Sequence, residues 1–456
     1  MRLLHVSDLH LGRALGDLSR EPEQRDLVGE LIAAADELAV ALTLISGDVF
    51  DSWNPPAWAE DLFFELLDGL AAGGQRAVAV IAGNHDSGLR LAAAEPLARR
   101  LGIVLAGNVG EPCRGFEGGE DRVRVTPLAP QVVRIEVPGA DAPIIAGLLP
   151  FLSEARVARD GEQGPLADLR GDGSRYAARL AAEIAARSAF TQRDAVRVLM
   201  LHQHATGGAS SDSERRLCIG PLGDLDVSAI PAGLDYVALG HLHRPQAILG
   251  AASPTYYAGS PIAYSFSEID QIKRAVLIDT AKGRAARITS VPLGSGRPLA
   301  IWTVTSIDEA RDHAARADAG NLSPIVEVRA DLGRRLDPDE GSALFHLGHP
   351  GHPGHPGHPG HLGHPGASPF LPGVTVVAVR DLHDPGRREL ASTTATEPPE
   401  LSAPELFREL WKKKHGSLPD DDTVAELCAA LLDAARSEEE AESRSRAAAA
   451  RAGGVG

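Results

Sequence analysis

Five short clusters of polar residues carry side chains that bind divalent metal ions, and each cluster directly follows a run of apolar residues. The clusters are SDLH (7–10), SGD (46–48), GNHD (83–86), LHQH (201–204) and GHLH (240–243). They offer carboxylate, amide and imidazole groups but no thiolate, which suits a borderline or hard ion such as Mn²⁺ rather than a structural zinc site. The candidate metal ligands are Asp8, His10, Asp48, Asn84, His85, His202, His241 and His243.

These candidate ligands are too many for a single ion. Two ions about 3.5–4 Å apart, bridged by one carboxylate, would account for their number, and this arrangement is a standard one for hydrolysing phosphate esters. Within DLH and HLH, the spacing of two residues keeps both potential ligands on one side of an extended backbone. The clusters therefore predict a two-metal phosphoesterase site.

Each candidate ligand also has a structural interpretation when it is considered alone. Asp8 could cap a helix, and Asp48 could close a turn. His202 or His241 could be a core histidine whose hydrogen bonds are satisfied. The repetition of the same pattern at five strand ends favours the metal site over these separate explanations.

Three nearby residues are given no ligand role. His5 and His204 lie beside the clusters rather than at their centres, and we interpret both as structural. Asp51, in GDVFD, is interpreted as a residue that caps a helix or supports a neighbouring ligand.

The elements that must position the clusters alternate between strands and helices. Residues 22–39 and 57–73 have apolar residues at helical spacing, and the second helix is expected to start at Pro55–Pro56 and stop at Gly73. This alternation predicts an α/β layered fold, and parallel strands in an open sheet would bring the clusters together at its carboxyl edge. The predicted strands are 2–7, 40–46, 77–82, 143–150, 196–201 and 235–239.

The second half of the chain has a different organisation. Strand-like runs at 255–260, 274–279 and 287–293 lack long helices between them, which indicates hairpin-type structure. A small α+β domain is expected over 297–390, followed by a Ser/Thr/Pro-rich linker at 391–402. Two helices are predicted at 403–416 and 421–442, and a frayed tail at 443–456.

A low-complexity tract, residues 346–366, repeats a three-residue unit of histidine, proline and glycine. In a polyproline II helix its imidazoles would line one side, so metal capture is one interpretation. A solvated, flexible insertion in a surface loop is favoured, because glycine in every unit makes an ordered site entropically costly. The histidines are His346, His349, His352, His355, His358, His361 and His364.

Composition limits the protein class. The chain has 456 residues and a net charge of −17, which argues against general adhesion to nucleic acid or anionic membranes but leaves local DNA contacts open. Its three cysteines match no zinc spacing and favour a reducing compartment. The polar N-terminus predicts no signal peptide, and no apolar run is long enough for a membrane span. We therefore expect a cytoplasmic protein.

Longer blocks around the clusters resemble the calcineurin-like metallophosphoesterase superfamily and, within it, the SbcD family, the bacterial counterpart of the eukaryotic and archaeal double-strand-break repair nuclease. The resemblance implies a four-layer α/β/β/α sandwich over 1–293, a capping domain over 297–390 and C-terminal helices. The His-Pro-Gly tract departs from the family pattern. The blocks are DLHLGR (8–13), GDVFDSWNPP (47–56), AGNHDS (82–87), DYVALGHLHRPQ (235–246), YAGSPIAYSFSE (257–268) and LFRELWKKKHGSLPDDD (406–422).

The resemblance also implies a role for each site residue. Asp8, His10 and His243 would hold one ion, with Asp48 bridging the two ions. Asn84, His202 and His241 would hold the second ion. His85 would approach the scissile phosphate as a general acid or transition-state stabiliser, a role that suits imidazole near neutral pH.

By the same resemblance, the chain is expected to be one component of a Mn²⁺-dependent DNA nuclease acting in DNA repair, recombination and replication, with Mg²⁺ as the alternative ion. It would be a 3′→5′ exonuclease on duplex ends and an endonuclease on single strands and hairpins. Its expected partner is an SbcC-type ABC ATPase with coiled-coil arms, two copies of each protein forming the complex, and residues 403–442 would dock it. Arg13 and Arg244 are candidate DNA contacts.

Two other functions are alternatives to the nuclease. A phosphoesterase for small substrates, such as a cyclic nucleotide or phosphomonoester, would use the same fold. The cap-like domain and the amphipathic C-terminal helices argue against it. An adaptor that has lost catalysis would be expected to lack Asp48 or His85, and both are present.

Overall fold

The structure is a computed structural model that describes residues 1–119, 121–152, 177–180, 182–183, 195–214, 224–281, 284–319, 323–347 and 374–382. Several predicted segments lie outside these residues. They are the His-Pro-Gly tract from residue 348 onward, the linker at 391–402, the two C-terminal helices and the tail.

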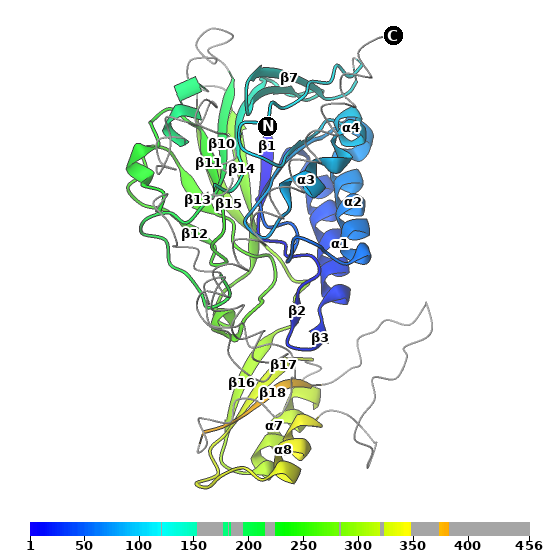
Figure 1. Ribbon diagram of the computed structural model, residues 1–456, viewed down its shortest axis with the longest axis vertical. Helices are drawn as coiled ribbons and strands as arrows, with labels where there is room; N and C mark the ends of the chain where they lie inside the picture. Colours follow the sequence, from blue (N-terminus) through cyan, green and yellow to red (C-terminus); the bar gives the residue numbers. More distant parts are fainter. Residues whose placement is uncertain are drawn as a thin grey trace, which may run out of the picture. The chain divides into compact units, whose positions relative to one another are not determined.

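The first sheet has six strands and carries the N-terminal clusters. Strands β1, β4, β5 and β6 are parallel, whereas β14 and β15 form an antiparallel hairpin at the other edge. Helices α1 (Glu21–Glu37) and α2 (Ala57–Ala71) cover one face of the sheet (Figure 1). The strand order is β15 (Arg284–Pro292), β14 (Arg274–Ala281), β1 (Arg2–Val6), β4 (Val40–Ser46), β5 (Ala77–Ile81) and β6 (Ile103–Ala106).

The second sheet has seven strands and carries the two later histidine clusters. Its four central strands are parallel, and antiparallel strands flank them on both sides. The order is β12 (Gln246–Ala247), β13 (Thr255–Tyr257), β11 (Tyr236–Gly240), β10 (Val196–His202), β9 (Ile144–Leu149), β8 (Val132–Glu136) and β7 (Arg124–Ala129).

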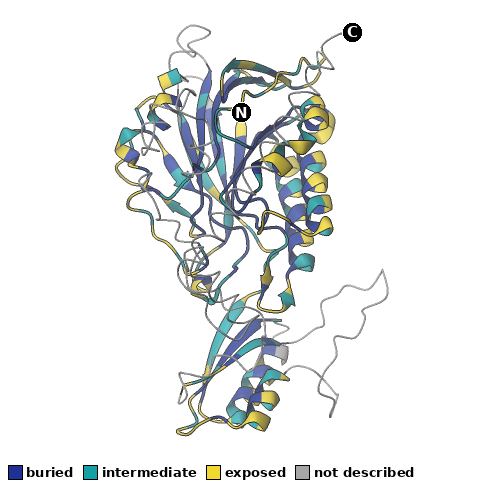
Figure 2. Cartoon of the chain, viewed as in Figure 1, coloured by how far each residue is buried: buried dark blue, intermediate teal, exposed yellow. Residues whose placement is uncertain are grey.

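The two sheets pack face to face because alternate residues of each strand point to opposite sides. In β4, Leu42 and Leu44 enter the core between the sheets, whereas Ile45 packs against the helices. Figure 2 shows the buried strands of both sheets and the exposed outer surfaces of α1 and α2. The other face of the second sheet packs against residues that include Ala177 and Leu180. The described residues therefore form a layer of helices and two sheets, together with part of the fourth layer that was expected on the outer face of the second sheet.

Most predicted strands are confirmed, and so in part is the sandwich implied by the family resemblance, but the single open sheet suggested by the strand pattern is not. The predicted strand at 40–46 coincides with β4, and α2 begins directly after Pro56 as expected. The clusters do not share one open sheet, however, since the strands that carry them divide between two. β6, β7 and β8 were not predicted. β13 is not part of a simple hairpin, because it pairs in parallel with β11.

A separate three-stranded sheet follows the shift in composition near residue 297. Its strands β16 (Leu299–Val304), β17 (Ile325–Ala330) and β18 (Thr375–Asp381) are all parallel. Helices α7 (Ile307–Ala319) and α8 (Pro338–Phe345) pack on it around a core of their own. Strands and helices therefore alternate, an α/β arrangement rather than the α+β arrangement expected, because helices make the crossovers that parallel strands need. The expected domain boundaries stay predictions.

The remaining short elements lie near the strand ends that carry the clusters. β2 (Ala14–Leu15) and β3 (Leu18–Ser19) form a small hairpin after the first cluster. The helices α3 (Gly88–Leu91) and α4 (Glu95–Ala98) follow the GNHD cluster.

Candidate metal centre

The five clusters meet where the two sheets come together. On the first sheet, the amide of Asp8 donates to the carbonyl of Gly47 and that of His10 to the carbonyl of Asp48, both at 3.0 Å. Across the sheets, the amide of His241 donates to the Asp8 carboxylate at 3.0 Å. These hydrogen bonds join the ends of β1, β4 and β11, so ligands that are far apart in sequence become neighbours.

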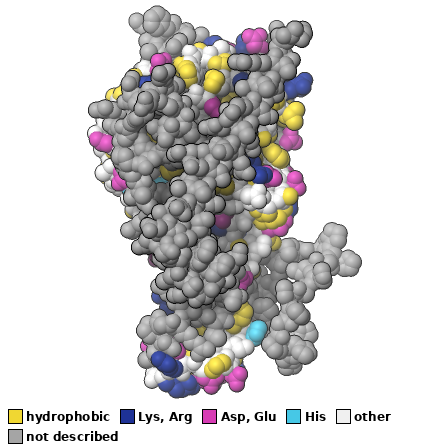
Figure 3. All heavy atoms as spheres, viewed as in Figure 1, with side chains coloured by type: hydrophobic (Ala, Val, Ile, Leu, Met, Phe, Trp, Pro, Cys, Tyr) yellow, Lys and Arg dark blue, Asp and Glu magenta, His cyan; other side chains and the backbone are white. Residues whose placement is uncertain are grey.

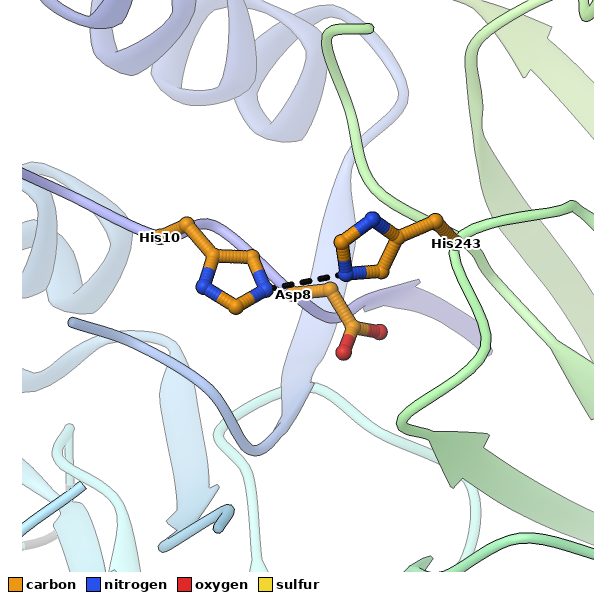
Figure 4. Close-up of side chains that lie close together, drawn as sticks. All are labelled: Asp8, His10 and His243. Atoms are coloured by element: carbon orange, nitrogen blue, oxygen red, sulfur yellow. Dashed lines mark hydrogen bonds between the residues drawn. The ribbon is translucent and has the colours of Figure 1, made fainter. Parts of the chain in front are cut away.

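The first group of side chains contains Asp8, His10 and His243. The Nε2 atoms of the two histidines lie 3.0 Å apart, and the Asp8 carboxylate points toward the same region (Figure 4). All three side chains are buried, and potential ligand atoms of the three lie within 4.8 Å of one another.

The second group contains Asn84, His202 and His241. The Asn84 Oδ1 atom lies 3.0 Å from both His202 Nε2 and His241 Nδ1. Asp48 lies between the two groups, because its Oδ2 atom is 3.4 Å from His202 Nε2 and 3.7 Å from His10 Nε2. A single carboxylate oxygen thus faces ligands of both groups.

The donor spacing fits bound cations. Ligand atoms about 2.0–2.2 Å from an ion, at right angles to each other, are about 3 Å apart. The His10–His243 and Asn84–His202 pairs have this separation. The buried histidines and aspartates are therefore suited to hold two metal ions.

The backbone at the centre is strained. Asp8, His10 and Asp48 have φ values of 54°, 44° and 48°, and His241 has a φ of 107°. Positive φ is unfavourable for residues with a Cβ, and such strain persists only where surrounding structure fixes it. Gly240 allows the sheets to approach, because a Cβ there would lie 1.9 Å from the carbonyl oxygen of Ser46.

Backbone carbonyls orient two of the imidazoles. His202 Nδ1 is 2.7 Å from the carbonyl oxygen of Ser46, and His85 Nδ1 is 2.7 Å from that of Asp51. A carbonyl only accepts, so each Nδ1 carries the hydrogen. This leaves His202 Nε2 unprotonated toward Asn84 and Asp48 when the ring is neutral, as a metal ligand requires.

Electrostatic coupling within the centre is strong. Burial raises the pKa of Asp8 to about 6, and burial lowers the pKa of His10 to about 3. Burial also disfavours protonation of His202, but the adjacent Asp48 carboxylate outweighs it and raises the pKa of His202 to about 9. The buried carboxylates therefore attract positive charge, and bound cations would supply it in place of protons.

His85 lies beside the two groups. Its backbone amide donates to Asp48 Oδ1 at 2.9 Å, and its ring centroid is 4.8 Å from that of His10. Among the described residues, His85 Nε2 makes no hydrogen bond. Asp51 sits behind both rings, with Oδ1 3.5 Å from His10 Nδ1 and its carbonyl on His85. The role expected for Asp51, as a residue that caps a helix or supports a neighbouring ligand, stays a prediction.

The two arginines predicted to contact DNA differ in their surroundings. Arg13 is partly buried, since its guanidinium lies 3.4 Å from the Asp51 carboxylate and over the ring of Tyr264. Arg244 is exposed. The side chain of Arg13 is thus held by Asp51 and Tyr264 beside the candidate metal centre, whereas the side chain of Arg244 can reach a ligand in solvent.

Sequence reasoning gave no role to several buried polar residues around the centre. The Asp86 carboxylate accepts hydrogen bonds from the amides of Val49, Phe50 and Gly83, which fixes the SGD and GNHD loops against each other. Asp86 follows His85 in the GNHD cluster, so its position was the available signal. Further polar residues, Ser213, Glu268 and Lys273, lie behind His243, and Ser213 is 55 positions from Glu268 in sequence.

The two histidines interpreted as structural lie outside the two ligand groups. His204 Nδ1 is 3.0 Å from Asp224 Oδ1. His5 is fully buried, with Nδ1 2.9 Å from the Tyr236 hydroxyl, while Nε2 has no partner among the described residues. Burial lowers the pKa of His5 to about 3.

His5 is expected to make the protein less stable in acid. The unfolded chain takes up a proton below its ordinary pKa of about 6.5, whereas folded His5 stays neutral down to a pKa of about 3. The free energy of unfolding should therefore fall as pH drops from 6.5, by up to about 1.4 kcal/mol per pH unit from this residue. Urea denaturation of the His5→Leu/Tyr236→Phe double variant should show a shallower decline between pH 6.5 and 4.5 than Tyr236→Phe alone. Equal slopes would contradict it.

Comparison with known proteins identifies the family. The calcineurin-like phosphoesterase model matches residues 1–245. The SbcD protein of the nuclease SbcCD from Bacillus subtilis (strain 168) is 37% identical over 329 residues, which cover 70% of this chain and 78% of the relative. The chain belongs to the SbcD family. Other relatives with the same name come from Rhodobacter capsulatus, 34% identical over 75% of this chain and 78% of the relative, and Escherichia coli K12, 28% identical over 66% and 70%.

Membership of the SbcD family agrees with the centre described above. The chain is a calcineurin-like phosphoesterase of the SbcD nuclease family, and thus a phosphoester hydrolase. The match to the phosphoesterase model runs through all five clusters, from Asp8 to His243. None of the described helices is long and apolar enough to cross a membrane.

Proposed function

We propose that this SbcD-family chain is a Mn²⁺-dependent DNA nuclease, with 3′→5′ exonuclease activity on duplex ends and endonuclease activity on single strands and hairpins. One observation carries the proposal: two groups of mostly buried donors face each other across the Asp48 carboxylate, whose Oδ2 lies 3.4 Å from His202 and 3.7 Å from His10. The mixture of carboxylate, amide and imidazole donors favours Mn²⁺, with Mg²⁺ as the alternative.

Each donor has a proposed role. The first ion would be held by Asp8, His10 and His243, and the second by Asn84, His202 and His241, with Asp48 shared between them. The bound ions would neutralise the phosphate charge and lower the pKa of an attacking water. The chain's own contribution is to hold these ligands rigidly. Their backbone is strained yet fixed by hydrogen bonds, so little reorganisation is needed when substrate binds.

His85 is proposed to act on the leaving oxygen of the scissile phosphodiester. The hydrogen on Nδ1 is engaged by the carbonyl of Asp51, at 2.7 Å. A hydrogen on Nε2 therefore exists only when the ring is an imidazolium, which can donate it to a departing alkoxide. The strand end that fixes His85 also carries Asn84, so the acid and the metal ligands are held by one rigid element.

DNA contact is proposed to be local. Acidic and basic side chains are interspersed over the described residues of the face in Figure 3, and the chain carries a net charge of −17. Arg244 is exposed beside His243 and is the stronger candidate for a phosphate contact. Arg13 would contribute by orienting Asp51 as well as by its charge.

An SbcC-type ABC ATPase is the proposed partner, since the relatives' name describes one component of the SbcCD nuclease. We propose a heterotetramer with two copies of each protein. Residues 403–442 would dock the ATPase, and the α/β unit from 297 to 390 would act as a cap that admits DNA. The proposed compartment is the cytoplasm.

A nuclease assay tests the proposed function. The purified full-length chain, with Mn²⁺ and with or without the ATPase partner, should shorten the strands of a 5′-labelled linear duplex and open a hairpin. EDTA should abolish both reactions, and Mn²⁺ added back in excess should restore them. Hydrolysis of a cyclic nucleotide or phosphomonoester, without DNA cleavage under either condition, would replace the nuclease proposal with the small-substrate alternative.

A further inference from the structure

A buried hydrogen-bonded bridge supports His243 from behind. The Ser213 hydroxyl lies 2.7 Å from His243 Nδ1 and 2.5 Å from Glu268 Oε1. All three side chains are largely buried, with Ser213 8% exposed and Glu268 1% exposed. We call this chain of contacts the Ser213–Glu268 bridge. Its members come from the segment after β10 and from the turn before β14, so only the fold brings them together.

The hydrogen-bond partners of Glu268 determine which atom donates in each hydrogen bond of the Ser213–Glu268 bridge. Glu268 Oε2 accepts hydrogen bonds from the Lys273 ammonium and from the Ser260 hydroxyl. An ionised carboxylate can only accept, so the Ser213 hydroxyl must donate its single hydrogen to Oε1. The Ser213 oxygen is then left to accept, and His243 Nδ1 must carry the hydrogen it receives. This fixes His243 as the Nδ1–H tautomer and leaves Nε2 with a free lone pair.

The lone pair of His243 points into the candidate metal centre. Nε2 lies 3.0 Å from His10 Nε2 and faces the region shared with Asp8 (Figure 4). The backbone of His243 is held as well, because its amide donates to Glu214 Oε1 at 2.6 Å and its carbonyl accepts from Lys273 at 3.2 Å. The carbonyl also accepts from the backbone amide of Ser260 at 3.1 Å. The ring and the backbone of this residue are therefore both fixed by their surroundings.

His243 differs in this respect from other histidines at the centre. His202 and His85 are oriented by the backbone carbonyls of Ser46 and Asp51, which no substitution removes. The Nδ1 atom of His243 is held instead by a side chain, that of Ser213. The geometry of His243 can therefore be altered by mutation without touching any proposed ligand.

We propose that Ser213 and Glu268 are positioning residues that hold His243 as the Nδ1–H tautomer and thereby set the affinity of one of the two metal positions. This inference rests on the proposed metal ligands. Lys273 contributes as well, because its ammonium group pairs with Glu268 and keeps that carboxylate ionised, so that it can only accept a hydrogen bond from Ser213. Groups that orient a ligating histidine typically change metal affinity about 10- to 100-fold when they are removed.

Mn²⁺ titration of the metal-free full-length chain tests this inference. Calorimetry of the wild type should resolve two bound ions. In Ser213→Ala, one ion should bind about 10- to 100-fold more weakly, while the other keeps its affinity. Ser213→Thr keeps the hydroxyl and should restore the binding. With two equivalents of Mn²⁺ added, electron paramagnetic resonance should show a coupled pair in the wild type and isolated Mn²⁺ in Ser213→Ala.

A matched control separates positioning from stability. Glu327 is another buried glutamate, ion-paired with Arg329 and Arg380 in the three-stranded sheet. Glu327→Gln should leave both Mn²⁺ affinities unchanged, whereas Glu268→Gln should weaken the same ion as Ser213→Ala. If the wild type binds two ions and Ser213→Ala binds both with unchanged affinity, the positioning role of Ser213 is overturned but the proposed metal centre is not. A wild-type chain that binds no pair of ions would instead contradict the proposed metal centre.

Discussion

The Asp48→Asn variant is expected to lose DNA cleavage by about 10³-fold or more and to bind fewer than two Mn²⁺ ions. Asp48 is the one carboxylate that faces both ligand groups, at 3.4 Å from His202 Nε2 and 3.7 Å from His10 Nε2. Losing several kcal/mol of charge stabilisation in the transition state corresponds to about three factors of ten in rate. The measurements are the rate of duplex cleavage in saturating Mn²⁺ and the number of ions retained after dialysis.

Asparagine is the informative replacement because it keeps the shape of the side chain. Its amide oxygen can still accept the hydrogen bond that the His85 amide gives to Oδ1 at 2.9 Å. The matched control is Asp235→Asn, since the Asp235 carboxylate also accepts a backbone hydrogen bond, from Arg197 at 2.7 Å, but at the start of β11. Wild-type cleavage and two bound ions in Asp48→Asn would refute the shared position proposed for this carboxylate.

Much of the centre could be predicted because polar residues that directly follow buried strands gather at the edge of a sheet; we call this the strand-end rule. Short apolar runs such as residues 40–46 form buried strands, and a polar residue directly after such a run must lie at the edge of the sheet. Asp48, Asn84 and His241 were identified by this position alone. The rule depends only on local sequence, so it does not need to know which strands become neighbours.

The same rule could not predict how the sheets assemble. Strands β10 and β11 belong to a second sheet, which packs on the first through an apolar core, and their clusters meet those of the first sheet at the strand ends. A run of apolar residues is equally suited to either sheet, because both faces of both sheets are covered. The sandwich was expected only through the family resemblance.

Supporting residues were missed for a related reason. Glu268 and Ser213 are 55 positions apart, and neither is next to His243 in sequence. A lone serine or glutamate carries no local pattern that distinguishes a buried supporting group from a solvated one. The ion pair between Arg13 and Asp51 was likewise not predicted, and the DNA contact expected of Arg13 stays a prediction.

The His85→Ala variant is expected to cleave DNA about 10²- to 10⁴-fold more slowly while it retains both metal ions. His85 contacts neither ligand group through Nε2, and its backbone amide still reaches Asp48 after the ring is removed. The rate of duplex cleavage and the stoichiometry of bound Mn²⁺ are measured on the same preparation. Loss of an ion would show that His85 is a ligand, contrary to its proposed role.

A comparison of substrates with different leaving groups tests whether His85 donates a proton. A DNA alkoxide needs protonation as it departs, whereas the nitrophenolate of bis(p-nitrophenyl) phosphate leaves as a stable anion. His85→Ala should therefore lose far more activity on DNA than on the nitrophenyl ester. The control is His204→Ala, because His204 lies close to His241, with ring centroids 6.2 Å apart, and pairs with Asp224; it should cleave both substrates at wild-type rates. Equal losses on both substrates in His85→Ala would favour stabilisation of the phosphate charge instead, since that contribution does not depend on the basicity of the leaving oxygen.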